Sequence, residues 1–432
     1  MAVDDRLRLP DDSGALVVLQ DRQASTVGMV RDNAAKLASD LTALRATRVF
    51  LSTDRADHLI VSLFACRAAS CDLVLHRAPG ATGELVAAMD ADVVLGADLV
   101  AMATGRSRTR PAAPQVVLMT SGTTGLPKAA GHDLDRLAGL IPVDRPGPAA
   151  RWLLTYHPAS FAGFQVILTA LLGQAPLAAL AQPDVVALTE LAVGFAPTAI
   201  SGTPTFWRAF LLALDGRDSR LPLRHATLGG EAVDQATLDR LRAHFPQARI
   251  THIYASTEAG AAFAVRDGCA GFPAAWLAED RDGLAMRIED GVLQLHSPRR
   301  MAGYVSGHAT PLDAQGWLDT GDLVKVEGDR VLFCGRANSV INVGGQKVIP
   351  EEVEAVILKV PDVVDAHVKG MRNPITGELV AADIVVAPGA DADRVTAAVK
   401  AAVRALPAYA APRIVRVVPE LAVTAGGKKH RA

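Results

Sequence analysis

Cysteine, metal-binding motifs and an excess of either charge are scarce in this sequence. The four cysteines form no CxxC pair and have no histidine at zinc-ligand spacing, which argues against a zinc site and a disulfide framework. Forty-four basic side chains against forty-six acidic ones leave a net charge of −2. No basic face for nucleic acid is therefore predicted. The run Arg106, Arg108 and Arg110 is interpreted as a solvated turn rather than a binding patch.

Long apolar runs are also missing. The longest, residues 166–181, is interrupted by Gly173, Gln174 and Pro176 and is too short to cross a membrane. The acidic, polar start of the chain lacks the pattern of a signal peptide. These features predict a soluble, cytoplasmic globular protein without a membrane partner, and they leave its oligomeric state open.

The length of 432 residues is enough for two domains. Up to about residue 300, strand-like apolar runs alternate with helix-like segments, which predicts an α/β fold of layered sheets and helices with largely parallel strands. Short strands and glycine turns from residue 291 indicate a more antiparallel, barrel-like edge. The expected strands include 49–52, 93–95, 115–119, 199–201, 226–228, 250–254, 292–296, 317–323 and 330–334, and the expected helices include 30–44, 59–69, 204–214 and 235–244.

The pattern changes again after Gly335-Arg336. A helix is expected to open at Pro350, because proline suits the first turn and the acids after it favour the helix dipole. Strands at 364–369 and 381–386 and a helix at 392–406 complete a small α+β domain. We therefore predict a large domain of residues 1–335 and a small domain of residues 336–432.

A nine-residue loop after an apolar strand concentrates hydroxyls, glycines and a lysine. Small residues let the backbone wrap around a polyanion, hydroxyls donate hydrogen bonds, and lysine supplies a charge. The loop is not a Walker A motif, because Pro127 rather than glycine precedes the lysine. An ordinary turn would explain a lone glycine pair, but the whole string predicts a phosphate-binding loop made by Thr120, Ser121, Gly122, Thr123, Thr124, Gly125 and Lys128.

Four more strings follow in chain order, each of which alone could be a turn, a strand end or a basic tail. They are Gly229-Gly230-Glu231-Ala232, Tyr254-Ala255-Ser256-Thr257-Glu258, Gly316–Leu323 followed by Gly335-Arg336, and Thr424–Arg431. Together with the loop they resemble the motifs of the AMP-forming adenylating superfamily. Its members include acyl- and aryl-CoA synthetases, peptide-synthetase adenylation domains and luciferases. The stretch before the loop is shorter than expected, so the chain looks like a short member.

The resemblance implies a role for each catalytic residue. Lys128 and its loop would hold the β- and γ-phosphates of ATP, and Thr257 would contact the α-phosphate. Glu258 would hold Mg²⁺, since this hard cation prefers carboxylate oxygen and bridges phosphates. Lys428 would be the mobile catalytic lysine that bridges the carboxylate and the α-phosphate.

The nucleoside would lie in a second group of residues. Tyr254 would lie against adenine, and Asp322 would accept hydrogen bonds from both ribose hydroxyls. Arg336 would be a second contact to ribose and phosphate. The remaining residues of this ATP/AMP-binding group are Gly229, Gly230, Glu231, Ala255 and Ser256.

The family builds its acyl pocket where this chain has residues 156–165. Amino-acid activators place an aspartate after an aromatic residue here, whereas this chain has Phe164-Gln165, which disfavours α-amino acids. With Phe206 nearby, a small aromatic or short apolar acid is favoured, although these phenylalanines could also be plain core. The predicted pocket residues are His157, Phe161, Gly163, Phe164 and Thr203.

The implied reaction is the ATP-dependent activation of a small carboxylic acid to its acyl-AMP, followed by transfer to a thiol. CoA is favoured as the acceptor, and the phosphopantetheine arm of an acyl carrier protein stays open. The hinge at about 336–339 has Asn338 where the family usually has a charged residue, so an enzyme that passes the adenylate to a non-thiol nucleophile is a second alternative. A nucleotide-binding pseudoenzyme is a third.

Overall fold

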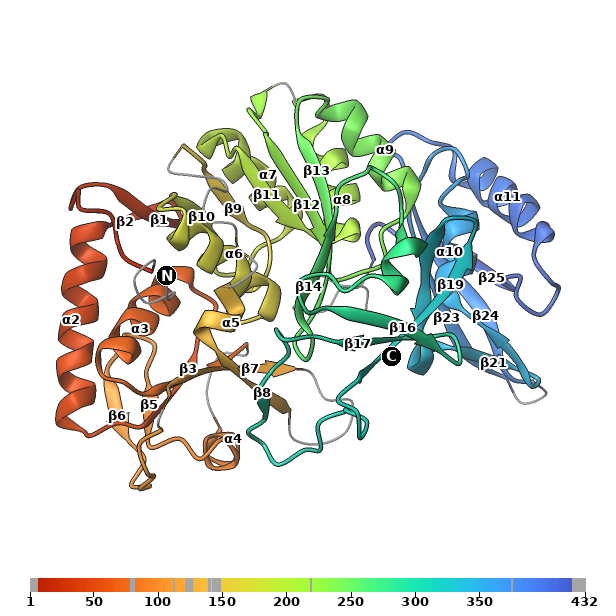
Figure 1. Ribbon diagram of the computed structural model, residues 1–432. Helices are drawn as coiled ribbons and strands as arrows, with labels where there is room; N and C mark the ends of the chain where they lie inside the picture. The colour runs from red at the N-terminus through yellow and green to blue at the C-terminus, as the bar shows by residue number, and fades with distance from the viewer. Residues whose placement is uncertain are drawn as a thin grey trace.

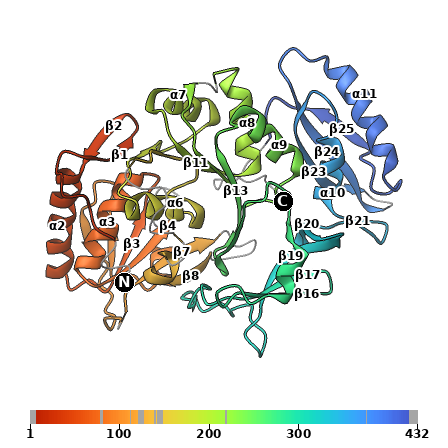
Figure 2. The ribbon, with the colours of Figure 1, turned by 45° about the horizontal axis from the view of Figure 1, so that its top comes forward.

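The computed structural model describes residues 7–77, 82–111, 113–120, 127–138, 141, 149–217, 220–373 and 376–421, with the side chain of Thr120 left aside. Layers of sheet and helix make up a large N-terminal part, and a smaller α+β unit follows it (Figure 1). The small unit lies at the opposite end of the molecule from α2 and α3 in both views (Figure 2).

The first large sheet has eight strands, and its six inner strands run parallel. Antiparallel pairs close both edges. In spatial order the strands are β14 (Gly260–Val265), β13 (Arg249–Ser256), β12 (His225–Gly229), β11 (Ala199–Gly202), β9 (Trp152–Leu154), β10 (Leu177–Ala179), β1 (Leu16–Gln20) and β2 (Gln23–Thr26).

The second large sheet has seven strands with a parallel centre formed by β7, β4, β3 and β5. Its remaining pairs are antiparallel. In spatial order the strands are β18 (Gly303–Tyr304), β8 (Lys128–Asp133), β7 (Gln115–Thr120), β4 (Asp72–His76), β3 (Arg48–Ser52), β5 (Val93–Leu95) and β6 (Ala101–Ala103).

Helices fill the layers around these sheets. The largest apolar core combines residues of both sheets with those of α2 (Val27–Ala43), α3 (Ala56–Ala68), α5 (Leu134–Ala138) and α6 (Phe161–Leu172). A second core packs α7 (Val185–Phe195), α8 (Pro204–Leu214) and α9 (Gln235–His244) on the other face of the eight-stranded sheet. A third core packs α4 (Gly83–Ala88) against the outer face of the seven-stranded sheet. Successive residues of one strand, such as Leu153 and Leu154, enter different cores, because side chains along a strand point alternately to its two faces.

A third sheet is fully antiparallel and follows the two large ones in the sequence. It confirms the antiparallel edge predicted from residue 291. Its strands are β15 (Phe272–Pro273), β20 (Arg330–Arg336), β19 (Leu318–Glu327), β17 (Val292–His296) and β16 (Ala285–Glu289), and a 3₁₀ helix, η2 (Ala274–Ala278), follows β15.

The small domain has its own sheet and its own apolar core. The sheet has the order β22 (Gln346–Val348), β21 (Ile341–Val343), β24 (Gly377–Val386) and β23 (Val363–Asn373), with β25 (Ile414–Val417) also paired to β24. The helices are α10 (Pro350–Ile357) and α11 (Ala392–Ala402), with 3₁₀ turns η3 (Ala337–Ser339) and η4 (Val403–Ala405).

The predicted α/β class, with a large N-terminal domain and a smaller α+β domain, is confirmed by this architecture. The predicted helices 204–214 and 235–244 have the predicted bounds. The predicted helix 392–406 was too long, since its α-helical part ends at Ala402 and a 3₁₀ turn follows. The boundary at residues 335/336 and the mobility of the small domain remain predictions.

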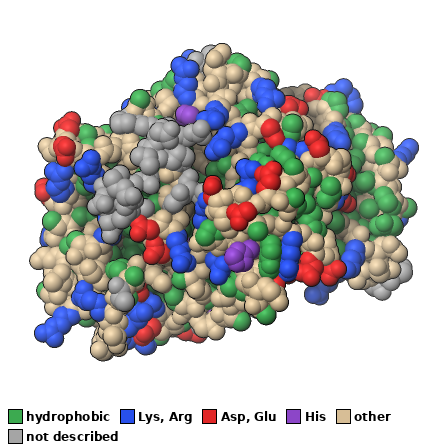
Figure 3. Space-filling view, viewed as in Figure 1, with side chains coloured by type: hydrophobic (Ala, Val, Ile, Leu, Met, Phe, Trp, Pro, Cys, Tyr) green, Lys and Arg blue, Asp and Glu red, His purple; other side chains and the backbone are tan. Residues whose placement is uncertain are grey.

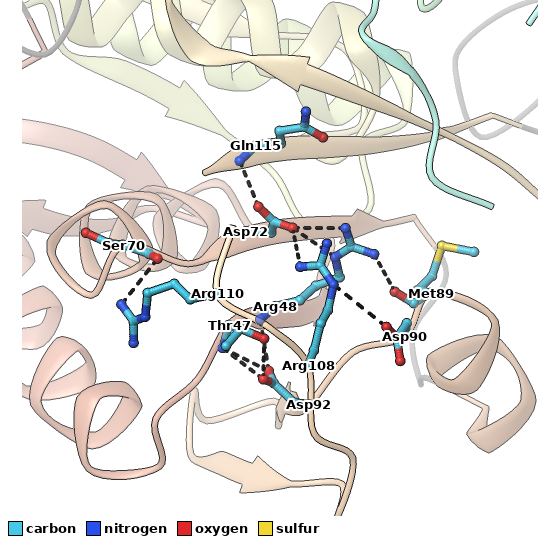
Figure 4. A network of polar contacts seen from close by, with 10 residues as sticks. All are labelled: Thr47, Arg48, Ser70, Asp72, Met89, Asp90, Asp92, Arg108, Arg110 and Gln115. Carbon is cyan, nitrogen blue, oxygen red and sulfur yellow. Dashed lines mark hydrogen bonds and ion pairs between the residues drawn. The ribbon is translucent and has the colours of Figure 1, made fainter. Parts of the chain in front are cut away.

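The interpretation of the arginine run as a solvated turn is wrong for Arg108. Its Nη1 lies 2.9 Å from Oδ2 of buried Asp72, which also pairs with Arg48 at 3.0 Å (Figure 4). Arg106 and Arg110 are both exposed. Arg110 nevertheless donates hydrogen bonds to the main-chain oxygens of the two residues that follow α3. Arg108 and Arg110 thus fasten the segment before β7 to its neighbours, which fixes the strand that leads into the phosphate loop.

Basic and acidic side chains are interspersed over the face of the molecule seen in Figure 3. In the part of the chain that the structure describes, no helix is both long and apolar enough to span a bilayer.

Candidate active site

A cleft of about 2430 Å³ is lined by residues from the large domain and from α10 of the small domain. Strands β13 and β14 of the eight-stranded sheet and β19 and β20 of the antiparallel sheet contribute to its wall. Many of the residues predicted from sequence meet here. They are Lys128, Phe161, Gly229, Gly230, Glu231, Tyr254, Ala255, Ser256, Thr257, Glu258, Asp322, Arg336 and Asn338.

One end of this set is organised around a carboxylate. The hydroxyl of Tyr254, on β13, donates a short hydrogen bond to Oδ2 of Asp322, on β19. Nε of Arg336 lies 3.3 Å from Oδ1 of the same carboxylate, and the guanidinium also donates to the main-chain oxygen of Thr320 at 2.7 Å. The motifs of β13, β19 and β20 therefore converge on one polar group, as the resemblance implies for a ribose site.

The ring of Tyr254 belongs to an aromatic cluster. It stacks with Phe263 at 5.2 Å and with Phe333 at 5.0 Å between ring centroids. Burial, reinforced by the charge of Asp322, raises the pKa of the Tyr254 hydroxyl well above its ordinary value. The phenol therefore stays protonated and acts as a hydrogen-bond donor. The predicted contact of Tyr254 with adenine remains a prediction.

A second polar group forms around Glu258. The hydroxyl of Tyr304 donates to Oε1 of Glu258 at 2.9 Å, and Nζ of Lys128 lies 5.6 Å from the centroid of the Tyr304 ring. Burial, followed by the charge of Glu258, raises the pKa of the Tyr304 hydroxyl. Tyr304 thus links the predicted metal ligand to the predicted phosphate lysine.

Tyr304 is not among the site residues predicted from the sequence. Its position depends on the pairing of β18 with β8, in which Tyr304 lies opposite Ala130, two residues after Lys128. The short Gly303-Tyr304 string could have drawn attention as a strand signal. Nothing in its local sequence places it beside a lysine so far away along the chain.

The Gly229–Glu231 segment lies where β12 ends. Gly230 has a φ of +86°, a left-handed conformation that a side chain would strain. The main-chain oxygen of Gly229 accepts a hydrogen bond from the Tyr156 hydroxyl at 3.4 Å. Oε2 of Glu231 accepts from the amide of Thr205 at 3.1 Å, at the start of α8. The segment is held by its neighbours and exposes its backbone to the cleft.

The predicted acid-pocket residues do not all line the cleft. Phe161 does, as do Tyr156 and Gln165. Phe164 is fully buried in the largest core, so it lies where the alternative interpretation expected it. Thr203 is buried and caps α8, because its hydroxyl accepts from the amide of Phe206 at 3.0 Å.

His157 and Gly163 form a structural pair at the start of α6. A Cβ on Gly163 would lie 2.1 Å from the carbonyl oxygen of His157, so only glycine fits. The Ser160 hydroxyl caps the helix by accepting from the amide of Gly163 at 3.0 Å. Burial, followed by the charge of Arg77, lowers the pKa of His157 to about 4, which keeps its ring neutral near pH 7. A pocket role for either residue remains a prediction.

Two family models match this chain. Residues 70–282 match the AMP-binding enzyme family, and residues 352–428 match the AMP-binding enzyme C-terminal domain. Both matched segments line the cleft, in the order in which the motifs occur. The chain belongs to the AMP-forming adenylating superfamily.

Two relatives in this superfamily are longer proteins. A nicotinic acid–CoA ligase of Penicillium canescens is 30% identical over 278 residues, which cover 60% of this chain and 51% of that protein. A p-hydroxybenzoic acid–AMP ligase of Mycobacterium tuberculosis is 29% identical over 339 residues, which cover 72% of this chain and 47% of that protein. The chain thus spans about half the length of these relatives.

A solved structure with the same fold is the anthranilate CoA ligase AuaEII in complex with anthranoyl-AMP. It has a TM-score of 0.81 and 18% sequence identity, and the match covers 99% of this chain and 95% of that chain. The likeness establishes that the adenylating-superfamily fold extends over nearly the whole chain.

Several predicted superfamily residues lie outside the described part of the chain. These are Ser121, Gly122, Thr123, Thr124, Gly125 and Lys428, together with the side chain of Thr120. Asn338 lies in the 3₁₀ turn that follows β20 and leads to the first strand of the small domain. Its role as a hinge remains a prediction.

Proposed function

We propose that this chain activates a small carboxylic acid with ATP, forming an acyl-adenylate and releasing pyrophosphate. The observation that supports this most is the order of groups along one cleft. The Tyr254–Asp322–Arg336 group suits a ribose, and the Glu258–Tyr304–Lys128 group suits a polyphosphate. A nucleotide placed between them would bring its α-phosphate near Thr257, which adjoins Glu258 in the cleft.

In the proposed reaction, a carboxylate oxygen of the acid attacks the α-phosphorus of ATP. A new oxygen–phosphorus bond forms, and the bond from the α-phosphorus to the oxygen that bridges it to the β-phosphate breaks, so pyrophosphate leaves with its electron pair. Little covalent chemistry falls to the protein, and positioning and charge neutralisation supply the catalysis. Lys128 would offset the charge on pyrophosphate, and Lys428 would offset the charge that develops at the α-phosphate.

Mg²⁺ fits this arrangement. Within the described residues no cluster of three or more histidine, cysteine or acidic side chains is suited to hold a metal ion. Magnesium in nucleotide sites commonly takes only one or two carboxylates and completes its shell with phosphate oxygens and water. Glu258, oriented by the Tyr304 hydroxyl, would be the protein's carboxylate for it. The ion would supply neutralisation of phosphate charge.

The pocket favours a small aromatic or short apolar acid. Trp152, Tyr156, Phe161 and Val166 line this part of the cleft. The side chain of Gln165 donates to the main-chain oxygen of Leu137 at 3.1 Å, and it carries no charge to hold an ammonium group. The nicotinic and p-hydroxybenzoic acids in the names of the two relatives are aromatic, which supports the same class.

The adenylate is then proposed to pass to a thiol, with CoA favoured over a carrier-protein phosphopantetheine. The first relative is named as a CoA ligase, which supports CoA. The second is named as an AMP ligase, so a chain that hands its adenylate to another acceptor stays the runner-up.

ATP–pyrophosphate exchange tests the proposal. The assay uses the full chain, Mg²⁺ and a panel of aromatic, short-chain, fatty and amino acids, with acid-free and metal-free reactions as controls. We expect exchange with aromatic or short apolar acids only. Exchange with an amino acid would overturn the substrate class, and tight ATP binding without exchange would support a pseudoenzyme. Positive acids are then tested for thioester formation with CoA and with a holo carrier protein.

A further inference from the structure

Arg77 follows β4 directly and lines the active-site cleft. Strand β4 runs parallel to β7, and Leu75 pairs with Leu118. Two residues further along each strand, Arg77 therefore stands level with Thr120, the first residue of the phosphate loop. Thr120 in turn pairs with Lys128 on β8. Arg77 and Lys128 thus occupy the same edge of the sheet, one on each side of the strand that enters the loop.

The half-buried guanidinium of Arg77 differs from those of the buried Arg48 and Arg208, because no described carboxylate forms an ion pair with it. Arg48 lies 3.0 Å from Asp72, and Arg208 lies 3.0 Å from Asp365. Within the described part of the chain, the Nε atom of Arg77 is buried and has no hydrogen-bond partner. Burial lowers the pKa of Arg77, and no carboxylate of the described chain opposes that shift. A largely buried charge without a carboxylate partner is costly, which is the expected condition of a site that binds an anion.

The surroundings hold Arg77 without neutralising it. Burial and then the nearby charge of Arg77 lower the pKa of the His157 side chain, and Nδ1 of His157 accepts a hydrogen bond from the amide of Ala159 at 3.2 Å. The ring of His157 stays neutral near pH 7, so it adds no second positive charge beside the guanidinium. Gly163 lets α6 approach the His157 carbonyl closely, which fixes that loop beside Arg77.

We propose that Arg77 binds the β- and γ-phosphates of ATP and the departing pyrophosphate, as a second cation beside Lys128. The proposal rests on the proposed function and extends its phosphate site to a residue outside the loop. An arginine fork binds two phosphate oxygens at once, whereas lysine supplies a point charge. Arg77 would thus orient the leaving group while Lys128 offsets its charge.

Calorimetric titration of the full chain with ATP, pyrophosphate and AMP, all with Mg²⁺, tests this binding without needing the acid. Arg77→Met keeps much of the side chain's length and removes the charge, and Arg77→Lys keeps the charge without the fork. Lys36→Ala, an exposed position on α2, is the control for the loss of one positive charge. Thermal melts accompany each variant, since removing an unpaired buried charge should not lower the melting temperature.

We expect Arg77→Met to weaken ATP and pyrophosphate binding about tenfold or more and to leave AMP binding unchanged, since AMP lacks the β- and γ-phosphates. The ATP and pyrophosphate affinities of Arg77→Lys should lie between those of the unmodified chain and Arg77→Met. Those of Lys36→Ala should equal those of the unmodified chain. Equal loss for AMP and ATP, or unchanged ATP and pyrophosphate affinity, would overturn the proposal. If instead only the KM for the acid rises in the exchange assay, Arg77 belongs to the acid pocket.

Failure of the proposed function can be distinguished from failure of the Arg77 assignment. It would appear as an absence of exchange with every acid in the unmodified chain, whatever the titrations show. Failure of the Arg77 assignment would appear as unchanged phosphate binding in a chain that still catalyses exchange.

Discussion

Arg208 on α8 and Asp365 on β23 form an ion pair of 3.0 Å between the large and the small domain. Their side chains are only 4% and 8% exposed. The same guanidinium lies 3.1 Å from Asp234 and donates to the hydroxyls of Thr205 and Thr237. Burial alone would lower the pKa of Arg208, but the nearby carboxylates, Asp365 first, raise it overall. One charged side chain therefore ties a strand of the small domain to two segments of the large one.

Removing this arginine should destabilise the chain more than changing its partner. Arg208→Met leaves buried carboxylates without their cation, and we expect it to lower the free energy of unfolding by about 3–5 kcal/mol. Asp365→Asn leaves Arg208 paired with Asp234, so about 1–2 kcal/mol is expected. Urea denaturation measures both. Arg394→Met, which breaks the exposed pair of Arg394 and Asp362, is the control and should cost less than about 1 kcal/mol. An equal loss of unfolding free energy in all three variants would contradict this prediction.

Buried His132 on β8 should make stability depend on pH. Burial lowers the pKa of His132 to about 4, below the ordinary value of 6.5. Between these values the unfolded chain binds more protons than the folded one, so the stability present above about pH 6.5 is lost as the pH falls towards 4. The expected loss is about 3 kcal/mol.

His132→Leu should flatten this dependence. The measurement is the free energy of unfolding from urea titrations at several pH values between about 4 and 7. The comparison uses the slope with pH, because the substitution also changes packing against Phe161, whose ring lies 5.8 Å from that of His132. His296→Leu removes an exposed histidine and serves as the control. An unchanged slope in His132→Leu would show that other groups carry the effect.

The hydroxyl of Tyr304 should affect the rate of adenylation because it orients Glu258. Tyr304→Phe keeps the ring beside Lys128 and removes only the hydrogen bond of 2.9 Å to Glu258. We expect kcat for pyrophosphate exchange to fall by about tenfold, as the loss of one hydrogen bond to a charged group implies, with the KM for the acid unchanged. Tyr409→Phe, at an exposed tyrosine, is the matched control. A rise in the Mg²⁺ concentration needed for half-maximal rate would distinguish positioning of Glu258 from a purely structural role.

Local signals predicted those elements whose ends carry clear caps. Helix α8 begins after Thr203 and has Pro204 in its first turn, and α9 begins after the capping Asp234. The hairpin of β1 and β2 and the strand β4 were not among the expected elements. Their formation depends on partners elsewhere in the chain, since β1 pairs with β10 and β4 pairs with β7.

The candidate site divides in the same way. Contiguous motifs predicted Asp322, Glu258 and Lys128, because each motif carries its chemistry within a few residues. Tyr304 and Arg77 could not be predicted so, because each becomes part of the site only through strand pairing. Phe164 shows the opposite case, since an aromatic residue inside a motif is fully buried in the core.

Substitution of Lys428 should cause the largest loss of activity. Lys428→Ala removes the cation assigned to the α-phosphate in the transition state, and we expect adenylation to slow by about a hundredfold or more. Single-turnover formation of the acyl-adenylate measures this step directly. The neighbouring Lys429→Ala controls for the charge of the tail. A loss of less than about threefold in Lys428→Ala would reject this role, since one transition-state contact is worth more.

Substitution of Gly163 tests whether close packing of α6 fixes the loop that contains His157. A methyl group on this residue would lie 2.1 Å from the His157 carbonyl oxygen and 3.1 Å from Cα of Pro158. Because both contacts are with backbone, α6 or the loop must shift, and we expect Gly163→Ala to cost about 1–3 kcal/mol of stability. Gly194→Ala, in α7, is the matched control, since its added methyl group meets no atom within 4 Å. That control should gain about 0.5–1 kcal/mol from helix propensity. The same two variants also test whether the loop positions Arg77. If it does, Gly163→Ala should weaken pyrophosphate binding in the calorimetric titration while Gly194→Ala does not. Lower stability with unchanged pyrophosphate affinity would show that Gly163 acts in packing and not in phosphate binding.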